Sequence, residues 1–363
     1  MKTIIIAGGG TGGHIYPALT IAKAIQSLNP ELHVEFVGTP EGLESKIIPK
    51  AGFKITYISV GKLNYKGGFL KKIKTILQLP WAFVRSLALV IEKKPILVLG
   101  VGGYASGPFV LASSVLGIPT ALWEPNAYPG MTNRILSRFV RKTFLVFEES
   151  RQKMKAKRIA VLGLPVREEI EKLNVASLEK KENGKNFRIL IFGGSQGARA
   201  INQCVSAMIN KFEFQDVEIV HQTGPVDFQG VEASYQGKSQ IKALEYLYDI
   251  ENYYLWADLV ICRAGASTLA ELAAARKPSI LVPLPSAADD HQKKNALSLV
   301  EKNAARMIEQ KDLTPESLFN LIVELRTQPG VLKKMSENVL HFYQPQAAKK
   351  IAEKLINLQF DNE

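Results

Sequence analysis

The chain has 363 residues, of which 46% are apolar types, and a formal net charge of +12. The length suits two globular domains of about 150–200 residues each, and two cysteines are too few for a disulfide scaffold. No apolar run reaches about 18 residues, and the run after Met1 is too short for a signal peptide, so we expect a cytoplasmic chain without a transmembrane helix.

The positive charge is concentrated in the first half of the chain. Residues 1–165 contain 22 Lys and Arg, 8 Glu and no Asp. We therefore expect this half to meet nucleic acid, an anionic membrane surface or a phosphorylated substrate. The simpler alternative is that the lysines only keep a domain soluble.

Apolar strand-like segments alternate with helical segments along the whole chain. The predicted strands are 3–7, 34–37, 55–58, 96–100, 119–123, 143–147, 159–162, 188–192, 217–221, 240–243, 259–262 and 279–282. Residues 17–27 and 267–275 are typical of the helices between them, and 345–358 of a terminal amphipathic helix. This alternation predicts an α/β fold with two Rossmann-like, doubly wound parallel sheets, divided near Gly163–Arg167.

The segment GGGTGGH, residues 8–14, follows the first predicted strand directly. Bare backbone at a helix N-terminus binds phosphate readily. The spacing fits a dinucleotide-binding pattern only weakly, because Glu35 lies inside the second strand rather than at its end. His14 would lie at the helix N-terminus, where the neutral imidazole is favoured and can accept a proton. A purely structural histidine is the alternative.

Three later stretches repeat or extend this chemistry. GGSQGAR, residues 193–199, follows another predicted strand, so two phosphorylated ligands are expected. In RAGASTLAE, residues 263–271, Glu271 could accept hydrogen bonds from ribose hydroxyls or form a capping box with Ser267 or Thr268. In DDHQ, residues 289–292, polar contacts to a sugar are favoured over a metal site.

Taken together, these stretches resemble the MurG family of glycosyltransferases, which add N-acetylglucosamine to lipid I in bacterial cell-wall synthesis. Seven segments carry the resemblance, in the family's order: GGGTGGHIYPALTIA (8–22), GVGGYASGPFVLAS (100–113), WEPNAYPGMTNRIL (123–136), LGLPVR (162–167), GGSQGARAIN (193–202), RAGASTLAEL (263–272) and DDHQKKNA (289–296).

The resemblance implies a GT-B architecture whose two domains face a cleft. Residues 1–165, with the helix 343–363 packing back on them, would take the acceptor, and residues 166–342 the UDP-sugar. It also implies an inverting, metal-independent enzyme without a cofactor. N-acetylglucosamine would pass from UDP-N-acetylglucosamine to the 4-hydroxyl of the muramyl sugar of undecaprenyl-diphosphate-linked lipid I, giving lipid II for peptidoglycan synthesis.

The resemblance assigns site residues as well. His14 is the expected base, with Glu124 as a second candidate or a group that orients the acceptor. The expected UDP-sugar contacts are Thr11, Gly12, Gly13, Asn126, Arg167, Ser195, Gln196, Leu247, Ala266, Ser267, Thr268, Glu271 and Gln292. The expected acceptor-diphosphate contacts are Gly10, Gly13, Gly103 and Tyr104. The family usually has Gln where this chain has Pro125, which removes a backbone donor.

Residues 67–94 suit a peripheral contact with the anionic inner-membrane surface on its cytoplasmic side. The apolar positions and the neighbouring lysines that predict it are Phe69, Leu70, Ile73, Leu77, Trp81, Lys71, Lys72 and Lys74. Pro80 should kink or split this helix, and we expect Leu87–Ile91 to belong to the core. The basic, aromatic-interleaved strands of single-strand binders are missing, so no nucleic acid partner is expected.

Three other functions compete with this interpretation. Another GT-B transferase, such as a diacylglycerol galactosyltransferase, would share the fold and similar loops. A UDP-N-acetylglucosamine 2-epimerase would share the donor site without needing a lipid-facing surface. A non-catalytic nucleotide-sugar-binding subunit is disfavoured because both glycine turns, His14 and Glu271 occur on one chain.

Overall fold

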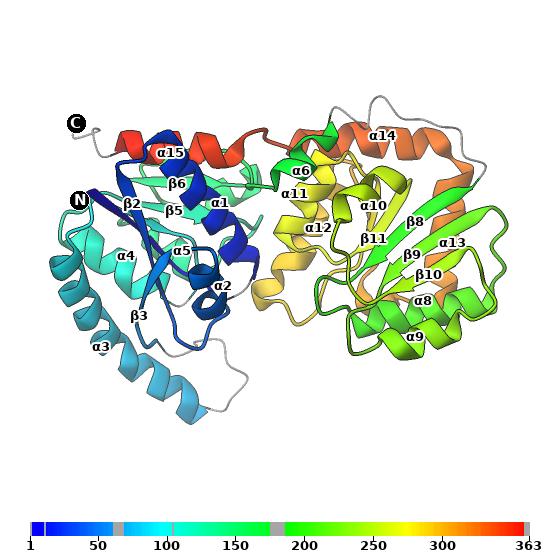
Figure 1. The fold of residues 1–363 in the computed structure, drawn as a ribbon, viewed down its shortest axis with the longest axis horizontal. Helices are drawn as coiled ribbons and strands as arrows, with labels where there is room; N and C mark the ends of the chain where they lie inside the picture. The colour runs from blue at the N-terminus through cyan, green and yellow to red at the C-terminus, as the bar shows by residue number, and fades with distance from the viewer. Residues whose placement is uncertain (1, 11, 61–68, 104, 175–185, 359–363) are drawn as a thin grey trace. The chain divides into compact units, whose positions relative to one another are not determined.

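The computed structural model describes residues 2–10, 12–60, 69–103, 105–174 and 186–358, and the side chains of residues 69–77 and of Pro329 are outside this description. The fold divides into two compact units (Figure 1). Unit 1 comprises Met1–Val166 and Gln346–Glu363, and unit 2 comprises Arg167–Pro345. Each unit is built around its own parallel sheet.

Unit 1 contains a seven-stranded parallel sheet in the order β3-β2-β1-β4-β5-β6-β7. The strands are β1 (Lys2–Ala7), β2 (Leu32–Gly38), β3 (Lys54–Tyr57), β4 (Leu97–Gly100), β5 (Thr120–Glu124), β6 (Lys142–Leu145) and β7 (Arg158–Val161). Each lies within two residues of its prediction, because buried parallel strands are nearly continuous apolar runs.

Helices cover both faces of this sheet. They are α1 (Gly12–Leu28), α2 (Glu44–Lys50), α3 (Phe69–Lys93), α4 (Ser106–Val115), α5 (Met131–Leu136) and α15 (Ala347–Leu358), with a 3₁₀ turn at Glu148–Lys153. Alternate strand residues such as Ile5 and Val98 share a core cluster with Leu89 of α3 and Phe109 of α4. On the other face α1 packs against β2, and α15 packs against α1 (Figure 1).

Two helices of unit 1 depart from the sequence expectations. The helix expected at 17–27 begins at Gly12, so the end of the glycine turn is already helical and Pro17 lies inside α1. α3 is continuous through Pro80, so of the two expected outcomes the split is wrong, whereas the kink stays a prediction. A proline removes only one helical hydrogen bond, and packing on the sheet offsets that loss.

Unit 2 contains a six-stranded sheet in the order β10-β9-β8-β11-β12-β13, again with parallel pairing throughout. The strands are β8 (Phe187–Phe192), β9 (Val217–Gln222), β10 (Ile241–Leu244), β11 (Leu259–Cys262), β12 (Ser279–Leu281) and β13 (Arg306–Met307). The sequence missed β13, since two residues at a sheet edge leave no periodic signal.

The helices of unit 2 also cover both faces of their sheet. They are α6 (Glu168–Glu171), α8 (Arg199–Lys211), α9 (Phe228–Ser234), α10 (Ile250–Trp256), α11 (Ala266–Ala274), α12 (His291–Val300), α13 (Pro315–Thr327) and α14 (Pro329–Val339), with 3₁₀ turns at Ala288–Asp290, Gln310–Asp312 and Leu340–Phe342. Ile191 and Ile219 of the sheet share a core cluster with Val205 of α8 and Ile322 of α13. Across the described parts of both units, no helix combines the length and apolar character that a membrane crossing needs.

Candidate functional site

The first glycine loop joins β1 to α1 at the carboxyl edge of the unit 1 sheet. Gly8 N–H donates to the carbonyl of Val37 at 2.9 Å, and Gly9 N–H donates to the carbonyl of Gly102 at 3.2 Å. Gly9 has φ +150°, and a Cβ placed there would lie 2.4 Å from the carboxyl carbon of Glu44. Glycine is therefore required by both the backbone angle and the lack of space.

His14 lies in the first turn of α1, and its imidazole packs against the loop after β4. A Cβ placed on Gly102 would lie 3.1 Å from Cε1 and 3.3 Å from Nδ1 of His14. Gly103 approaches the same glycine loop, since its Cβ would lie 2.5 Å from the carbonyl oxygen of Gly9. The structure thus brings His14, Gly103 and the glycine loop together in unit 1, whereas Thr11 and Tyr104 lie outside the described residues.

Glu44 is a functional candidate that the sequence did not indicate. Its Oε2 accepts the N–H of Gly10 at 2.7 Å, and its Oε1 accepts the N–H and the hydroxyl of Thr39 at 3.0 and 2.9 Å. The side chain is buried at 2% exposure. Gly10, expected as an acceptor-diphosphate contact, therefore already donates its N–H to a carboxylate within the protein.

Glu124, at the end of β5, is buried and accepts four hydrogen bonds. Asn126 donates its backbone N–H at 2.9 Å and its side-chain amide at 3.2 Å, while Gly130 N–H and the Asn133 amide donate at 3.0 and 2.9 Å. Burial raises the pKa of the Glu124 carboxyl, and these donors oppose that rise. A carboxylate has about four acceptor positions, so Glu124 holds the segment after Pro125 and has no position left for a substrate proton.

The second glycine turn follows β8 in unit 2 and lies close to the loop after β9. Gly197 N–H closes the turn on the carbonyl of Gly194 at 2.8 Å. Gly197 has φ +73°, and a Cβ there would lie 1.8 Å from the carbonyl oxygen of Thr223. Ser195 and Gln196, at the tip of the turn, are exposed. The turn thus presents its polar tip to solvent and its glycine to the neighbouring loop.

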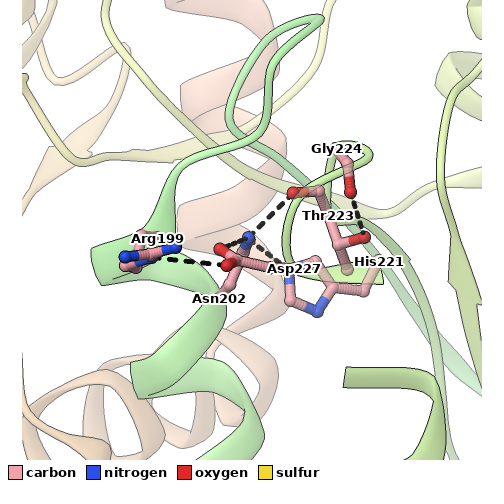
Figure 2. A network of polar contacts seen from close by, with 6 residues as sticks. All are labelled: Arg199, Asn202, His221, Thr223, Gly224 and Asp227. Atoms are coloured by element: carbon pink, nitrogen blue, oxygen red, sulfur yellow. Dashed lines mark hydrogen bonds and ion pairs between the residues drawn. The ribbon is translucent and has the colours of Figure 1, made fainter. Parts of the chain in front are cut away.

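A buried polar network holds that neighbouring loop in place (Figure 2). Asn202 of α8 donates through Nδ2 to the carbonyl of Thr223 and to Oδ2 of Asp227, both at 2.8 Å. Asp227 also accepts from Nε of Arg199 at 3.3 Å. The first turns of α8 are thereby tied to the loop that meets Gly197.

His221 of β9 completes this network as a neutral ring. Because the Asn202 amide points its Nδ2 toward Thr223, its Oδ1 faces Nε2 of His221 at 3.1 Å, so Nε2 carries the proton. Nδ1 then accepts from the hydroxyl of Tyr235 at 2.7 Å. Burial lowers the pKa of His221 from 6.5 to about 3.

Glu271 of α11 lies beside Arg167 and Tyr254. Its Oε2 accepts the Tyr254 hydroxyl at 3.0 Å, and its Oε1 is 3.9 Å from a guanidinium nitrogen of Arg167. Burial raises the pKa of Glu271, and Arg167 opposes that rise. The capping-box alternative is wrong, because Gly265 is the N-cap of α11 and no side chain caps the helix. Ala266, Ser267 and Thr268 form the first turn of the same helix.

An open pocket of about 530 Å³ adjoins the second glycine turn. Its lining residues are Ser195, Gln196, Pro225, Glu245, Tyr246 and Tyr248. The Tyr246 and Tyr248 rings meet edge to face with centroids 4.9 Å apart, and Tyr248 is 85% exposed. Leu247, between them, is buried. The sequence analysis did not predict a role for the two tyrosines. The available signal was that tyrosines alternate with Leu247 just after a predicted strand.

The remaining segment with predicted sugar contacts, residues 289–292, spans the end of a 3₁₀ turn and the first turn of α12. Gln292 accepts the N–H of Leu284 through Oε1 at 3.0 Å, which holds the proline-containing loop on the helix. Asp289 and Asp290 both adopt left-handed backbone angles, with φ +52° and +53°. Within the described residues, no group of three or more His, Cys, Asp or Glu side chains is placed to hold a metal.

α3 presents both buried and exposed apolar side chains. Trp81 is 72% exposed, whereas Leu89 and Val90 belong to the core. Ile91 is 61% exposed, so its predicted core position is wrong. The other predicted membrane contacts, Phe69, Leu70, Lys71, Lys72, Ile73, Lys74 and Leu77, have side chains outside the described part of the chain.

Both halves of the chain match known domains of one glycosyltransferase family. Residues 4–145 match the glycosyltransferase family 28 N-terminal domain, and residues 188–355 match its C-terminal domain. The chain belongs to glycosyltransferase family 28. The family includes a UDP-N-acetylglucosamine–N-acetylmuramyl-(pentapeptide) pyrophosphoryl-undecaprenol N-acetylglucosamine transferase of Bdellovibrio bacteriovorus, 50% identical over 98% of this chain and 99% of its own. A transferase of the same name from Myxococcus xanthus is 42% identical over 99% of this chain and 93% of its own.

A solved structure of a similar protein has the same fold. The crystal structure of Acinetobacter baumannii MurG is 30% identical, with a TM-score of 0.84 over 98% of this chain and 100% of its own. The expected α/β GT-B fold, with two parallel-sheet domains, is thereby confirmed. A UDP-N-acetylglucosamine 2-epimerase of Neisseria meningitidis has a TM-score of 0.65 at 15% identity, over 98% of this chain and 100% of its own, so it shares the fold alone.

Proposed function

We propose that this chain is an inverting transferase that moves N-acetylglucosamine from UDP-N-acetylglucosamine to the 4-hydroxyl of the muramyl sugar of lipid I. The product is lipid II, the precursor of peptidoglycan. The observation that carries the proposal is the 50% identity to a transferase of this name over 98% of the chain. The 2-epimerase alternative rests on a shared fold at 15% identity, which does not carry over an activity.

Unit 2 would bind the donor. Ser195 and Gln196 would contact the diphosphate, because they lie at the exposed tip of a turn that runs into the N-terminus of α8. Glu271, in the second turn of α11, would accept the ribose hydroxyls beside Arg167. The pocket at Tyr246 and Tyr248, around the backbone of Leu247, would take the uracil, and Gln292 would hydrogen-bond the sugar.

Unit 1 would bind the acceptor and remove its proton. His14 is the proposed base, because it lies at the positive end of α1 beside Gly102, where the neutral ring is favoured. Glu124 is the weaker candidate, since its four hydrogen bonds make it a positioning residue for Asn126. Gly12, Gly13 and Asn126 would contact the sugar of the UDP-sugar donor, and Gly103 would line the acceptor-diphosphate site.

The reaction needs no bound metal in this proposal. The acceptor oxygen attacks the anomeric carbon, the bond to the diphosphate oxygen breaks, and His14 takes the hydroxyl proton. The charge that develops on the departing UDP would meet backbone N–H groups of the second glycine turn and of the α8 N-terminus. The enzyme would work as a peripheral protein on the cytoplasmic face of the inner membrane, where its lipid-linked acceptor lies.

The test is radiolabel transfer from UDP-N-acetylglucosamine to a short-chain lipid I analogue in the presence of EDTA. Wild type should transfer, and His14→Ala should lower the rate by about 100-fold or more, the usual contribution of a general base. His33→Ala, a change of an exposed histidine on β2 of the same unit, serves as the matched control. Absence of transfer with intact UDP-sugar binding would overturn the function, and an unchanged His14→Ala rate would overturn the assignment of the base.

A further inference from the structure

Glu44 is a buried carboxylate that the reaction itself does not use. It is the first residue of α2, and the structure gives its two oxygens three donors, from Gly10 and Thr39. Gly10 belongs to the loop after β1 and Thr39 to the loop after β2. One carboxylate therefore joins the carboxyl ends of two neighbouring strands.

The backbone around Glu44 is shaped to receive this side chain. A Cβ on Gly9 would lie 2.4 Å from its carboxyl carbon, on Gly38 2.7 Å from its Cγ, and on Gly42 2.0 Å from its Oε2. Real Cβ atoms do not approach so closely. Three glycines on three sides thus leave the space that the carboxylate fills, so its position is set by the fold.

The opposite side of the glycine loop is fixed independently. Gly9 N–H donates to the carbonyl of Gly102, and Gly102 also lies against the imidazole of His14. The loop is therefore held between Glu44 and the loop after β4, directly before the turn of α1 that carries His14. Loss of the contact with Glu44 would therefore release one side of the loop from which the chain enters α1.

We propose that Glu44 is a positioning residue for the acceptor side of the reaction: by holding Gly10 and Thr39 it sets the loop that presents His14 to the acceptor hydroxyl. This inference rests on the proposed function. It also removes Gly10 N–H from the acceptor-diphosphate contacts, because that N–H is bonded to the carboxylate. The remaining proposed contacts of the acceptor diphosphate are then Gly13 and the loop at Gly103.

The test compares Glu44→Gln with Glu35→Gln in the full-length chain. Glu44→Gln keeps the shape but places an amide NH₂ against an N–H donor, so one of the two loops loses its acceptor. Glu35 is the matched control, since it is a partly buried carboxylate of β2 that pairs with Lys93 of α3 at 2.7 Å, away from the glycine loop.

Two readouts are expected to separate the variants. In Glu44→Gln, kcat/KM for the lipid I analogue should fall by about 10- to 100-fold, since a displacement of about 1 Å at the reacting groups can have that effect. The KM for UDP-N-acetylglucosamine should change by less than the acceptor parameter, because most of its proposed contacts are in unit 2 and only those at Gly12 and Gly13 adjoin the loop that Glu44 holds. Hydrogen exchange should accelerate in the peptide containing residues 8–14. Glu35→Gln should change neither the acceptor kinetics nor that peptide.

Thr39→Val provides a milder second variant if Glu44→Gln folds poorly. It removes one of the three donors, and it should produce a smaller loss in the same acceptor parameter. Equal losses for acceptor and donor, or unchanged acceptor kinetics despite faster exchange of residues 8–14, would overturn the proposal. Wild type without transfer would overturn the proposed function and the acceptor role together, and the exchange measurement would then decide alone whether Glu44 holds the loop.

Discussion

Three buried or partly buried glutamates have different roles because their partners differ. Glu124 accepts four donors from one chain segment, and Glu44 accepts three donors from two loops. Glu271 has the Tyr254 hydroxyl on one oxygen and the Arg167 guanidinium 3.9 Å from the other. Of the three, Glu271 retains acceptor capacity beside a charged partner, which suits a ligand hydroxyl.

Tyr254→Phe should weaken donor binding through Glu271. The hydroxyl of Tyr254 is the donor that fixes Oε2, and a hydrogen bond to a charged group contributes about 10-fold or more in binding. We expect the KM for UDP-N-acetylglucosamine to rise by about 10-fold, with Tyr253→Phe on the same helix as control. With a UDP-sugar that contains 2′-deoxyribose, the KM values of wild type and Tyr254→Phe should differ much less, because this substrate lacks a hydroxyl for Glu271. An equal rise in KM for the ribose and the 2′-deoxyribose UDP-sugar would contradict the prediction.

At the scale of single residues, the sequence indicated polar residues near glycine turns. It did not indicate residues whose contacts lie far away in the chain. His14, Ser195 and Glu271 lie in the turns or the first two helical turns that follow β1, β8 and β11, so the carboxyl edge of a parallel sheet places them without further information. Glu44 contacts Gly10 across 34 positions of the chain, and Tyr254 contacts Glu271 across 17. Such pairs depend on the packing of separate elements, which periodicity does not contain.

At the scale of elements, the two glycine turns depend on the loops that pack against them. In unit 2 the turn after β8 and the loop after β9 pack backbone against backbone, since a Cβ on Gly197 would lie 1.8 Å from the carbonyl of Thr223. The same exclusion of side chains occurs in unit 1 at Gly9. Each turn thus has its shape set by a neighbouring loop, and the helix after it starts from a fixed point.

Gly197→Ala should therefore displace the second turn. The left-handed backbone angle alone costs an alanine about 1–2 kcal/mol, and the contact with Thr223 adds to that cost. We expect UDP affinity measured by calorimetry to fall by about 10-fold or more, together with a lower melting temperature. Gly230→Ala in α9, where a Cβ meets open space, is the control: it should leave UDP affinity unchanged and should not lower the melting temperature, because alanine favours a helix more than glycine does.

α3 is predicted to bind anionic membranes through its lysine-rich first turns. Charge reversal of Lys71, Lys72 and Lys74 removes about 1 kcal/mol of attraction for each lysine. Partitioning onto vesicles with anionic lipid should fall by about 100-fold, while weak binding to neutral vesicles should stay the same. Trp81→Ser should also weaken binding, and Ile91→Ser, another exposed apolar position on this helix, should not. Unchanged sedimentation with anionic vesicles would contradict the prediction.

Element boundaries were predictable where apolar runs are bounded by glycine or proline. All twelve predicted strands occur, each within two residues of its expected ends. The start of α1 and the continuity of α3 were not predictable, because Pro17 and Pro80 normally end helices and only packing on the sheet keeps them inside. β13 is formed by its pairing with β12, which no local pattern reports.

At the scale of the whole molecule, stability should depend on pH through His221. Its pKa is about 3 in the folded state and 6.5 as a free side chain, so the unfolded chain binds a proton first as the pH falls. The stabilising contribution is complete above about pH 6.5 and is lost as the pH falls toward 3.

Urea unfolding at pH 7 and pH 4.5 measures this effect. Wild type should lose about 2–3 kcal/mol more than His221→Gln between these two pH values, because the variant has no ring to protonate. His33→Gln, a change of an exposed histidine on β2, should retain the wild-type difference. The same pH difference in wild type and His221→Gln would contradict the assignment of the neutral ring.

The path of the chain also determines the order in which the units can be completed during synthesis. Unit 2 is one continuous segment, Arg167–Pro345, whereas unit 1 requires α15, whose residues Ile351 and Leu355 are fully buried. At about 5–20 residues per second, the ribosome needs roughly ten seconds or more to make the intervening segment. During that time the face of α1 that α15 covers has no partner from its own chain. The unit that leaves the ribosome first is therefore the last to close, and a chain that ends early at Pro345 would carry a complete unit 2 beside an incomplete unit 1.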